Sequence, residues 1–461
     1  MRDPDTEVLN RVIEKAIRGS APAQINVPRD YWTQVIDIEL PPIVRLERQA
    51  GGTEAIERAS KLLSEAKFPV ILSGAGVVIG GAIDDCVKLA EKLDSPVCSG
   101  YQHNDSFPGS HPLAVGPLGY NGSKAAMQLI SKADVVLALG TRLNPFSTLP
   151  GYGIDYWPKD AKIIQVDMNS DRIGLTKKVT VAICGDAKLV SQQLLAKLSP
   201  KAGDIDRQKR KDIIHQTKSA WLQELSSLDH EEDDKGTVWN KEARERDKDR
   251  MSPRQSWRAI QAGMPEDVII SSDIGNNCAI GNAYPTFEKG RKYLAPGLFG
   301  PCGYGFPAIL GAKIGCPDTP VIGFAGDGAF GISMNEMSSC ARKEWPAITM
   351  VIFRNYQWGA EKRNSILWFD DNFVGTELDP ELSYAKVANA CGLKGVTVKT
   401  MEETTKAIRQ SCEDQKKGIT TFIEVILNQE LGEPFRRDAM KKPVRIAGIK
   451  KEDMKVQKNL N

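Results

Sequence analysis

Two short apolar runs, each followed at once by a polar turn, restrict the fold of this chain most strongly. The first run, Val321–Ala325 (VIGFA), leads directly into the tripeptide Gly326–Gly328 (GDG). The second run, Ala347–Phe353 (AITMVIF), is followed closely by residues Asn355–Gly359 (NYQWG). Continuous apolar runs of this length are typical of strands buried on both faces of a parallel sheet. We therefore expect an α/β fold in which both turns leave the carboxyl edge of one sheet, where such folds bind ligands.

The two turns carry the chemistry of a metal–diphosphate site. Gly326 and Gly328 lack a Cβ atom, so the backbone can turn sharply and approach a ligand closely. Asp327 between them offers a carboxylate oxygen, and Asn355 follows the neighbouring strand. These two side chains and a nearby backbone carbonyl can share one Mg²⁺ ion, with water and phosphate oxygens in its remaining positions. The alternative is a structural turn beside a surface asparagine; the two strands, the spacing and the asparagine together favour the metal site.

Alternating strand and helix patterns divide most of the chain into two α/β units. Residues 50–195 form the first unit, with strands expected at Pro69–Ser73, Pro96–Cys98, Asp134–Leu139 and Lys162–Val166. Residues 251–430 form the second unit, with strands expected at Asp267–Ser272, Val321–Ala325, Ile348–Phe353 and Thr420–Leu427. We therefore predict two doubly wound parallel-sheet domains, of which the first is Rossmann-like and the second binds the diphosphate.

Helices are expected between the strands of both units. In the first unit they span Ala55–Ala66 and Ile83–Leu93, and in the second unit one spans Phe330–Arg342. The amino terminus of that last helix would direct free N–H groups and a positive dipole end at an anion beside Asp327.

The tripeptide Gly74–Gly76 (GAG) ends the first expected strand and has two interpretations. It can be a dinucleotide-binding loop or a plain turn at a strand end. The full Gly-x-Gly-x-x-Gly pattern with an acidic residue about 20 positions later is absent, so the plain turn is favoured.

Three segments lie outside the two units. Residues 1–45 contain one amphipathic helix, over Glu7–Arg18, and one strand, over Ala23–Val27, which are too little to bury a core. Residues 196–250 are expected to form a charged linker, because Asp229–Arg250 is almost wholly polar. Residues 431–461 are expected to form a basic, polar surface tail.

Composition limits the partners of this 461-residue chain. Its formal net charge is +2, from 61 basic and 59 acidic residues, so neither nucleic acid nor an anionic membrane is an expected partner. No apolar run reaches the roughly 18 residues that a membrane helix needs. The nine cysteines are scattered and form no Cys-x-x-Cys pair, so we expect reduced thiols in the cytoplasm.

The Gly-Asp-Gly turn, the 26 residues after it and Asn355 resemble the cofactor-binding motif of thiamine diphosphate enzymes. The resemblance implies that Asp327, Asn355 and the main-chain oxygen of Gln357 hold Mg²⁺, with thiamine diphosphate bound above it. Ser272–Asn277 resembles the family's diphosphate loop, and Gly300–Pro307 resembles its glycine-rich segment near the thiazolium ring. The cofactor-binding residues implied by the resemblance are Gly275, Asn276, Asn277, Gly300, Cys302, Gly303, Gly326, Asp327, Gly328, Ala329, Asn355, Gln357 and Gly359.

The same resemblance concerns the start of the chain. Gly19–Asp30 resembles the last strand of the family's N-terminal, pyrimidine-binding domain, so residues 1–45 are expected to be the end of that domain. The family activates its cofactor with a glutamate of that domain, and no position of this chain matches it. The catalytic residue therefore stays unassigned, and we expect an N-terminally truncated chain that is inactive alone. Cys302 stands where the family places a large aliphatic residue under the cofactor; the alternative is a buried core cysteine.

Three longer segments, residues 25–41, 151–169 and 361–378, are similar to one acyltransferase branch of the family. That branch implies small anionic substrates and a homo-oligomer, with Arg354, Lys362 and Arg363 as candidate donors to the substrates. The alternatives are an acetolactate synthase-like enzyme and a non-catalytic chain that binds metal diphosphate. His103 and His111 lie in the loop after Cys98 and are expected to face solvent; the alternative is that they line a substrate cavity.

Overall fold

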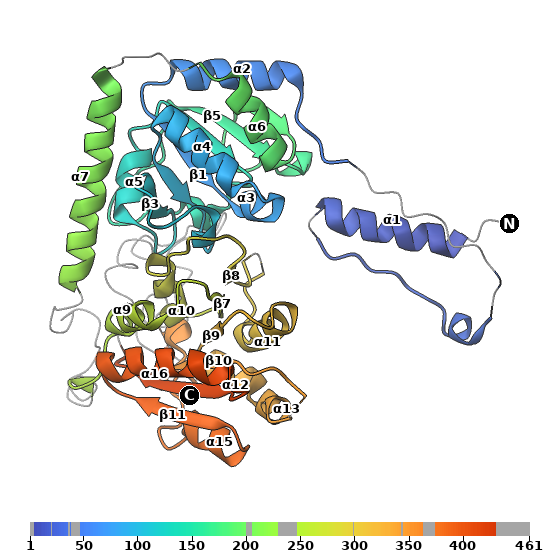
Figure 1. The fold of residues 1–461 in the computed structure, drawn as a ribbon, viewed down its shortest axis with the longest axis vertical. Helices are drawn as coiled ribbons and strands as arrows, with labels where there is room; N and C mark the ends of the chain where they lie inside the picture. The colour runs from blue at the N-terminus through green and yellow to red at the C-terminus, as the bar shows by residue number, and fades with distance from the viewer. Residues whose placement is uncertain are drawn as a thin grey trace, which may run out of the picture.

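A computed structural model arranges the chain mainly as two α/β domains (Figure 1). It describes residues 4–19, 21–35, 37, 47–199, 205–228, 247–297, 299–342, 344–362 and 374–429. Each domain is built on one six-stranded sheet, and all neighbouring strands in both sheets are parallel. The predicted fold class, two doubly wound parallel-sheet domains, is therefore confirmed.

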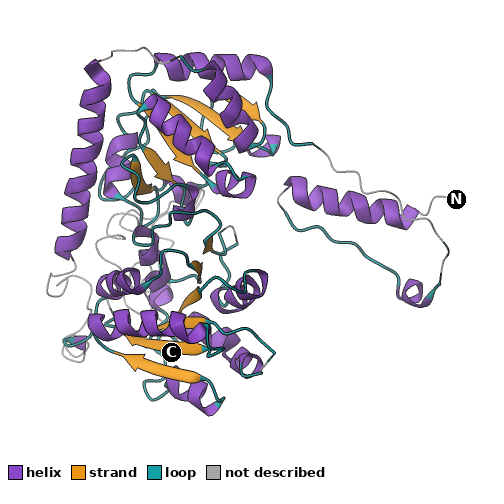
Figure 2. Ribbon diagram, in the orientation of Figure 1, coloured by secondary structure: helices purple, strands orange, loops and turns teal. Residues whose placement is uncertain are grey.

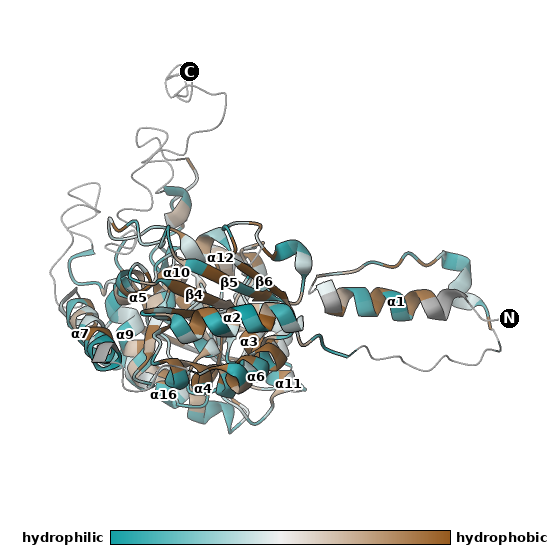
Figure 3. Ribbon diagram, turned by 90° about the horizontal axis from the view of Figure 1, so that it is seen from above, coloured by the Kyte–Doolittle hydropathy of each residue, from teal (hydrophilic) through white to brown (hydrophobic). Residues whose placement is uncertain are grey.

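The sheet of the first domain has the strand order β3-β2-β1-β4-β5-β6, which is the order of dinucleotide-binding folds. Its strands are β1 (Pro69–Ser73), β2 (Val97–Ser99), β3 (Ala114–Pro117), β4 (Val135–Leu139), β5 (Lys162–Asp167) and β6 (Val181–Cys184). The central strands β1 and β4 are buried along their whole length, as their continuous apolar sequences predict. Coloured by hydropathy, β4 and β5 appear brown at the centre of this domain (Figure 3).

Five helices belong to this first sheet. They are α2 (Thr53–Glu65), α3 (Ala75–Gly80), α4 (Ile83–Leu93), α5 (Lys124–Ile130) and α6 (Ala187–Lys197). At the start of α3, a Cβ on Gly74 would lie 2.6 Å from the carbonyl oxygen of Gly140, and a Cβ on Gly76 would lie 2.7 Å from the Cα of Gly140. The close approach of two backbones explains these glycines, which supports the interpretation of Gly74–Gly76 as a plain turn.

The second sheet has the strand order β11-β12-β10-β9-β7-β8. Its strands are β7 (Ile269–Ser272), β8 (Tyr293–Leu294), β9 (Val321–Gly326), β10 (Thr349–Arg354), β11 (Lys394–Val398) and β12 (Thr421–Ile426). Helices flank this sheet in Figure 2; they are α9 (Pro253–Gly263), α10 (Asn276–Ile280), α11 (Gly305–Gly315), α12 (Asp327–Ser333), α13 (Met337–Cys340), α15 (Tyr384–Ala390) and α16 (Met401–Gln415).

Single turns of 3₁₀ helix complete the two domains. They are η2 (Asn104–Ser106), η3 (Pro145–Thr148), η4 (Ser170–Arg172), η5 (Gly281–Ala283) and η6 (Met334–Glu336). The turn η6 separates α12 from α13, so the prediction of one continuous helix over Phe330–Arg342 is wrong. Ser333 ends α12 and Asn335 lies within η6; serine and asparagine favour helix ends because their side chains compete for backbone hydrogen bonds.

A long helix, α7 (Ile205–Leu228), lies within the segment predicted as a linker. It runs along the first domain in Figure 1 and packs against α5. The guanidinium of Arg210, which is buried, donates to the carbonyls of Leu93 at 2.9 Å and Asp94 at 3.0 Å. Residues 229–246, which hold most of the charged run, and the predicted tail 431–461 lie outside the described residues.

The N-terminal segment extends away from both domains in Figures 1 and 3, and it is tied to the first domain by a hydrogen bond from Nη2 of Arg172 to the carbonyl of Gly19 at 3.0 Å. It contains α1 (Pro4–Gly19) and the short helix η1 (Arg29–Thr33). Residues Ala23–Val27 are not in a strand, so that prediction is wrong: no neighbouring strand among the described residues offers backbone partners.

Two further observations bear on the environment of the protein. None of the nine cysteines is in a disulfide. No helix among the described residues combines the length and the apolar character that crossing a membrane requires.

Candidate functional site

Three loops of the second domain meet beyond the carboxyl edge of its sheet. Strand β7 lies between β8 and β9, so the chain moves to one side after β7 and to the other side at β9. Such a switch point opens a crevice beyond the strand ends, where doubly wound folds bind ligands. Gly275 follows β7, Asp327 follows β9, and Asn355 follows β10, so all three predicted loops border this region.

A hollow at this place brings most of the predicted residues together. Its lining residues are Ile274, Gly275, Asn276, Asn277, Cys278, Cys302, Gly326, Asp327, Gly328, Ala329, Asn355, Gln357, Trp358, Gly359, Ala360 and Glu361. Of the predicted binding residues, only Gly300 and Gly303 do not line it. The N–H of Gly303 instead donates to the carboxylate of Asp273 at 3.1 Å, which fixes the glycine-rich segment against β7. That the lining residues bind a cofactor stays a prediction.

Asp327 lies at the bottom of the hollow and is only 1% exposed. Its Oδ2 accepts the N–H of Tyr356 at 2.7 Å and Nη1 of Arg354 at 3.1 Å, and its Oδ1 accepts the N–H of Gly328 at 3.0 Å. Burial raises the pKa of Asp327 to about 6, although Arg354 and the two N–H groups act in the opposite direction. Tyr356 is the residue after Asn355, so this hydrogen bond holds the carboxylate of Asp327 beside the loop that carries Asn355, as the candidate metal site requires.

Side-chain amides converge beside this carboxylate. A Cβ on Gly359 would lie 3.2 Å from Nδ2 of Asn276, 3.4 Å from Nε2 of Gln357 and 3.8 Å from Nδ2 of Asn355. Three amides from two different loops therefore surround one glycine, and a larger residue at position 359 would displace them.

The hollow offers unsatisfied oxygens and free space to a ligand. Oδ1 of Asn277 and Oε1 of Gln357 are buried and accept no hydrogen bond from the described part of the chain. Buried polar atoms of folded proteins nearly always have a partner, so these two indicate a missing one. Gly275 has a φ of 123°, which favours glycine, and a Cβ on Gly275 or Gly326 would meet nothing within 4 Å. These features fit a bound metal diphosphate.

The candidate metal ligands are all oxygens. Across the described ranges, no group of three His, Cys, Asp or Glu side chains could hold a metal ion by itself. Asp327, Asn355 and the carbonyl of Gln357 offer one carboxylate and two neutral oxygens, a set that suits Mg²⁺ when phosphate oxygens complete its shell. The backbone pairing of Gln357 with Glu377 uses groups of the neighbouring residues, which leaves the Gln357 carbonyl out of that pairing.

Two of the predicted cationic donors to substrate, Arg354 and Lys362, do not line the hollow. Arg354 is fully buried and pairs with Asp327, so its prediction as a substrate ligand is wrong. Lys362 is 3% exposed and pairs with Glu377, and Arg363 lies outside the described residues. A side chain at the end of a buried strand can face either sheet surface or the ligand, and the sequence alone does not distinguish these directions.

Two other predictions concern single side chains. Cys302 is exposed and lines the hollow, so the alternative of a buried core cysteine is wrong. His103 is mostly buried instead of facing solvent, and burial, with a contribution from nearby Arg142, lowers its pKa to about 4.

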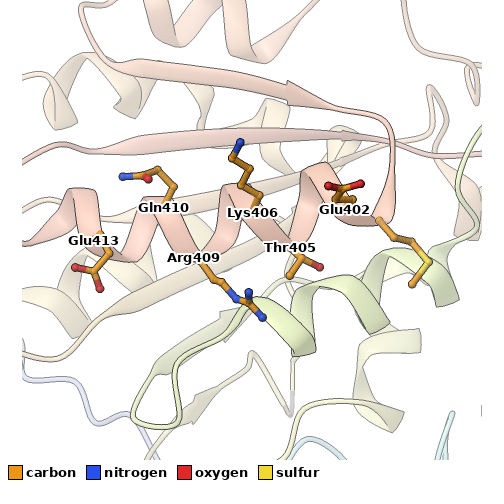
Figure 4. A pocket seen from close by; sticks show the side chains of 7 residues that line it. Glu402, Thr405, Lys406, Arg409, Gln410 and Glu413 are labelled. Atoms are coloured by element: carbon orange, nitrogen blue, oxygen red, sulfur yellow. The ribbon is translucent and has the colours of Figure 1, made fainter.

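A second hollow lies along helix α16 and contains none of the predicted residues (Figure 4). It is lined by Met401, Glu402, Thr405, Lys406, Arg409, Gln410 and Glu413. Thr405 and Arg409 donate to the carbonyls of Ala259 at 2.9 Å and Ala262 at 2.8 Å. This hollow is therefore the groove where α16 packs on α9.

Comparisons with known proteins match both domains of the chain. Residues 56–194 match the central domain of thiamine pyrophosphate enzymes, and residues 273–425 match their C-terminal TPP binding domain. The chain is 76% identical, over its whole length and 78% of the relative's length, to a protein of Rhizobium meliloti named "Probable sulfoacetaldehyde acetyltransferase". It is 72% identical to the sulfoacetaldehyde acetyltransferase of Roseovarius nubinhibens, over 99% of this chain and 76% of that protein.

A more distant relative belongs to the alternative branch. The acetolactate synthase large subunit of Corynebacterium glutamicum is 28% identical, over 92% of this chain and 66% of that protein. The matches to both domains and the identity to the first two relatives place the chain without ambiguity. The chain belongs to the thiamine pyrophosphate enzyme family.

Proposed function

We propose that this chain carries the cofactor-binding part of a sulfoacetaldehyde acetyltransferase, the enzyme that converts sulfoacetaldehyde and phosphate to acetyl phosphate and sulfite. The observation that carries the proposal is the 76% and 72% identity to two relatives of that name over essentially the whole chain. The 28% identity to an acetolactate synthase makes that alternative activity the weaker candidate. In the proposed reaction the carbon–sulfur bond breaks, sulfite leaves, and the acetyl group passes to phosphate.

The roles of the site residues follow from the hollow. Asp327, Asn355 and the carbonyl of Gln357 would hold Mg²⁺, and the glycines at 275 and 326 leave the space that a diphosphate needs. Oδ1 of Asn277 and Oε1 of Gln357 would accept hydrogen bonds from ordered water, such as the water that hydrates the metal ion. Thiamine diphosphate, when bound, supplies the carbanion chemistry that a carbonyl substrate needs.

Activation of the cofactor is proposed to depend on a glutamate that the 461 residues do not contain. The family resemblance assigns this role to the pyrimidine-binding domain, and the chain spans 78% and 76% of its two relatives. We therefore propose that the 461 residues alone bind metal and cofactor but do not turn over substrate.

The proposal also includes the oligomeric state of the protein and its cellular compartment. Helix α1 exposes Leu9, Ile13 and Ile17, which recur on one side of the helix and suit cover by another domain or subunit. We propose a homo-oligomer that works in the cytoplasm, where nine unpaired thiols remain reduced.

An assay of sulfite release tests the activity. The chain is incubated with sulfoacetaldehyde, phosphate, Mg²⁺ and thiamine diphosphate, alone and together with the part of the Rhizobium meliloti relative that lies outside the match. We expect sulfite and acetyl phosphate in equal amounts from the mixture and none from the chain alone. Pyruvate in place of sulfoacetaldehyde should give no acetolactate.

The outcomes separate the parts of the proposal. Sulfite from the chain alone would contradict the need for an added glutamate and support the activity. Acetolactate from pyruvate, or no product from the mixture, would overturn the assigned activity. The variant Asp327→Ala, which removes the carboxylate from the metal site, is the control that must abolish any product.

A further inference from the structure

Arg354 is the last residue of β10, and its guanidinium is enclosed on all sides. The residue has no exposed surface. Its Cζ atom lies 4.2 Å from the ring centroid of Tyr356 and 5.3 Å from that of Tyr384. Nη2 donates to the carbonyl of Leu382 at 3.0 Å and also to that of Asp379. An arginine held by two rings and two carbonyls has a single orientation.

That orientation directs the guanidinium at Asp327, the candidate metal ligand. Nη1 of Arg354 lies 3.1 Å from Oδ2, the same oxygen that accepts the N–H of Tyr356. Oδ1 accepts only the N–H of Gly328 among the described residues. The hydroxyl of Tyr384 donates to the main-chain carbonyl of Asp327 at 2.9 Å. Both ends of this aspartate, which lines the hollow, are therefore fixed, and its Oδ1 has one partner among the described residues where Oδ2 has two.

A second buried carboxylate holds Arg354 from behind. Oε1 of Glu424, on β12, lies 3.8 Å from Nε of Arg354. Glu424 is itself fixed, because it accepts hydrogen bonds from Ser383 Oγ at 2.7 Å and from Thr397 Oγ1 at 3.1 Å. Three buried charged groups thus form a row from β12 to the hollow, and each needs its neighbour because an unpaired buried charge is costly.

We propose that Arg354 is a positioning residue for the metal site: it occupies Oδ2 of Asp327, so that Oδ1 alone is presented to Mg²⁺. This role rests on the proposed cofactor site and deepens it. Groups that orient a metal ligand from behind typically change metal affinity about 10- to 100-fold when they are replaced. Arg354 therefore acts through Asp327 and does not touch substrate.

The variant Arg354→Lys tests this role, because lysine keeps the charge but cannot reach Asp327 and the carbonyls of Asp379 and Leu382 together. Mg²⁺ is titrated calorimetrically into the full chain in the presence of saturating thiamine diphosphate. We expect the dissociation constant of Mg²⁺ to rise about 10- to 100-fold. The matched control is Arg210→Lys, which changes another buried arginine in the other domain and should leave Mg²⁺ binding at the wild-type level.

A purely structural role predicts a different result. In that case both lysine variants would lose thermal stability, and folded Arg354→Lys would bind Mg²⁺ with wild-type affinity, which would overturn the proposal. If Arg354→Lys does not fold, the double variant Arg354→Met/Glu424→Gln is measured in its place; it neutralises Glu424 together with Arg354, so that one buried carboxylate instead of two loses its partner. The same rise in the dissociation constant is expected there, and wild-type affinity in the folded double variant would again contradict the role.

The measurement contains no sulfoacetaldehyde, so it is independent of the assigned activity. A chain that binds Mg²⁺ but releases no sulfite would leave the role of Arg354 standing. A wild-type chain that binds no Mg²⁺ in the presence of thiamine diphosphate would overturn both the cofactor site and the role of Arg354.

Discussion

Gly326 and Gly328 flank the same carboxylate, but they need the absence of a side chain for different reasons. A Cβ on Gly328 would lie 2.8 Å from the ring of Trp358, whereas a Cβ on Gly326 would meet nothing within 4 Å. Neither residue has a positive φ, so backbone strain does not explain them. Gly328 is therefore required for internal packing, and Gly326 is required only if a ligand fills the space above it.

The two alanine variants should separate these reasons. We expect Gly328→Ala to lower the free energy of unfolding by about 1–3 kcal/mol through overpacking against Trp358. Gly326→Ala should keep or slightly raise that free energy, because alanine adopts its φ of −70° without strain. Urea denaturation without cofactor measures both.

Gly326→Ala should change the affinity for the cofactor, although it does not lower the free energy of unfolding. Calorimetric titration with thiamine diphosphate and Mg²⁺ should show weaker binding in this variant at unchanged stability. Wild-type affinity would mean that no ligand approaches Gly326 closely, which would count against the proposed diphosphate position.

At the scale of single elements, the loop between β2 and β3 encloses most of the His103 side chain, which disfavours the charged form of its imidazole. Burial lowers the pKa of His103 to about 4, from an ordinary value of 6.5. The unfolded chain therefore takes up a proton near pH 6.5, whereas the folded chain does so only near pH 4. Protons bind preferentially to the unfolded state between these values, so the contribution of His103 to stability is lost as the pH falls through this window.

The variant His103→Gln should remove this pH dependence. We expect the wild-type free energy of unfolding to fall between pH 7 and pH 5 by on the order of 1–2 kcal/mol from this group. The variant should show a smaller fall over the same range, measured by urea denaturation at both pH values. His111→Gln, which changes a histidine whose imidazole pairs with exposed Glu91, is the control and should behave like the wild type. An equal fall in wild type and His103→Gln would contradict the assignment.

At the scale of the whole molecule, hydrogen bonds join the two domains between residues 102–105 of the first domain and residues 282–292 of the second. The side chain of Asn104 donates to the carbonyls of Asn282 and Pro285, both at 2.8 Å. Oδ1 of Asn282 accepts the N–H of Gln102 at 3.0 Å, and Asn282 has no exposed surface. Asp105 accepts the N–H of Lys292 at 2.9 Å just before β8. The position of the hollow relative to the first domain thus depends on buried polar contacts.

Asn282→Ala should weaken the coupling between the domains. Loss of the amide leaves the buried N–H of Gln102 without its acceptor, at a cost of about 1–3 kcal/mol. We expect calorimetric unfolding to separate into two transitions, where the wild type shows one. Ser110→Ala removes an exposed contact between the domains, to Glu288 at 2.7 Å, and should leave the single transition intact. Two transitions in the wild type, or one in Asn282→Ala, would show that this segment does not couple the domains.

Local sequence was sufficient for the strands that are buried on both faces and for the loops that follow them. Four buried strands end within one residue of the predicted position: β1, β4, β9 and β10. A continuous apolar run that is bounded by turn residues has few alternatives to a buried strand. The apolar runs before Asp327 and Asn355 predicted that both residues follow strands of one parallel sheet, and β9 and β10 are indeed neighbours. The family, the fold class and the core of the candidate site all depend on these local patterns.

Only the tertiary structure decided the elements and contacts that depend on neighbours. Strands β3, β6, β8 and β11 are short or partly polar, and they are strands because an adjacent strand offers them a hydrogen-bonding edge. Ala23–Val27 lacks such a neighbour among the described residues and is not a strand. The direction of Arg354 likewise depends on Tyr384 and Glu424, which are distant in the chain and become its neighbours only when α15 and β12 are in place. A side chain's surroundings are set by long-range packing, and so Arg354, which the sequence suggested as a donor to substrate, is found paired with Asp327, the candidate metal ligand.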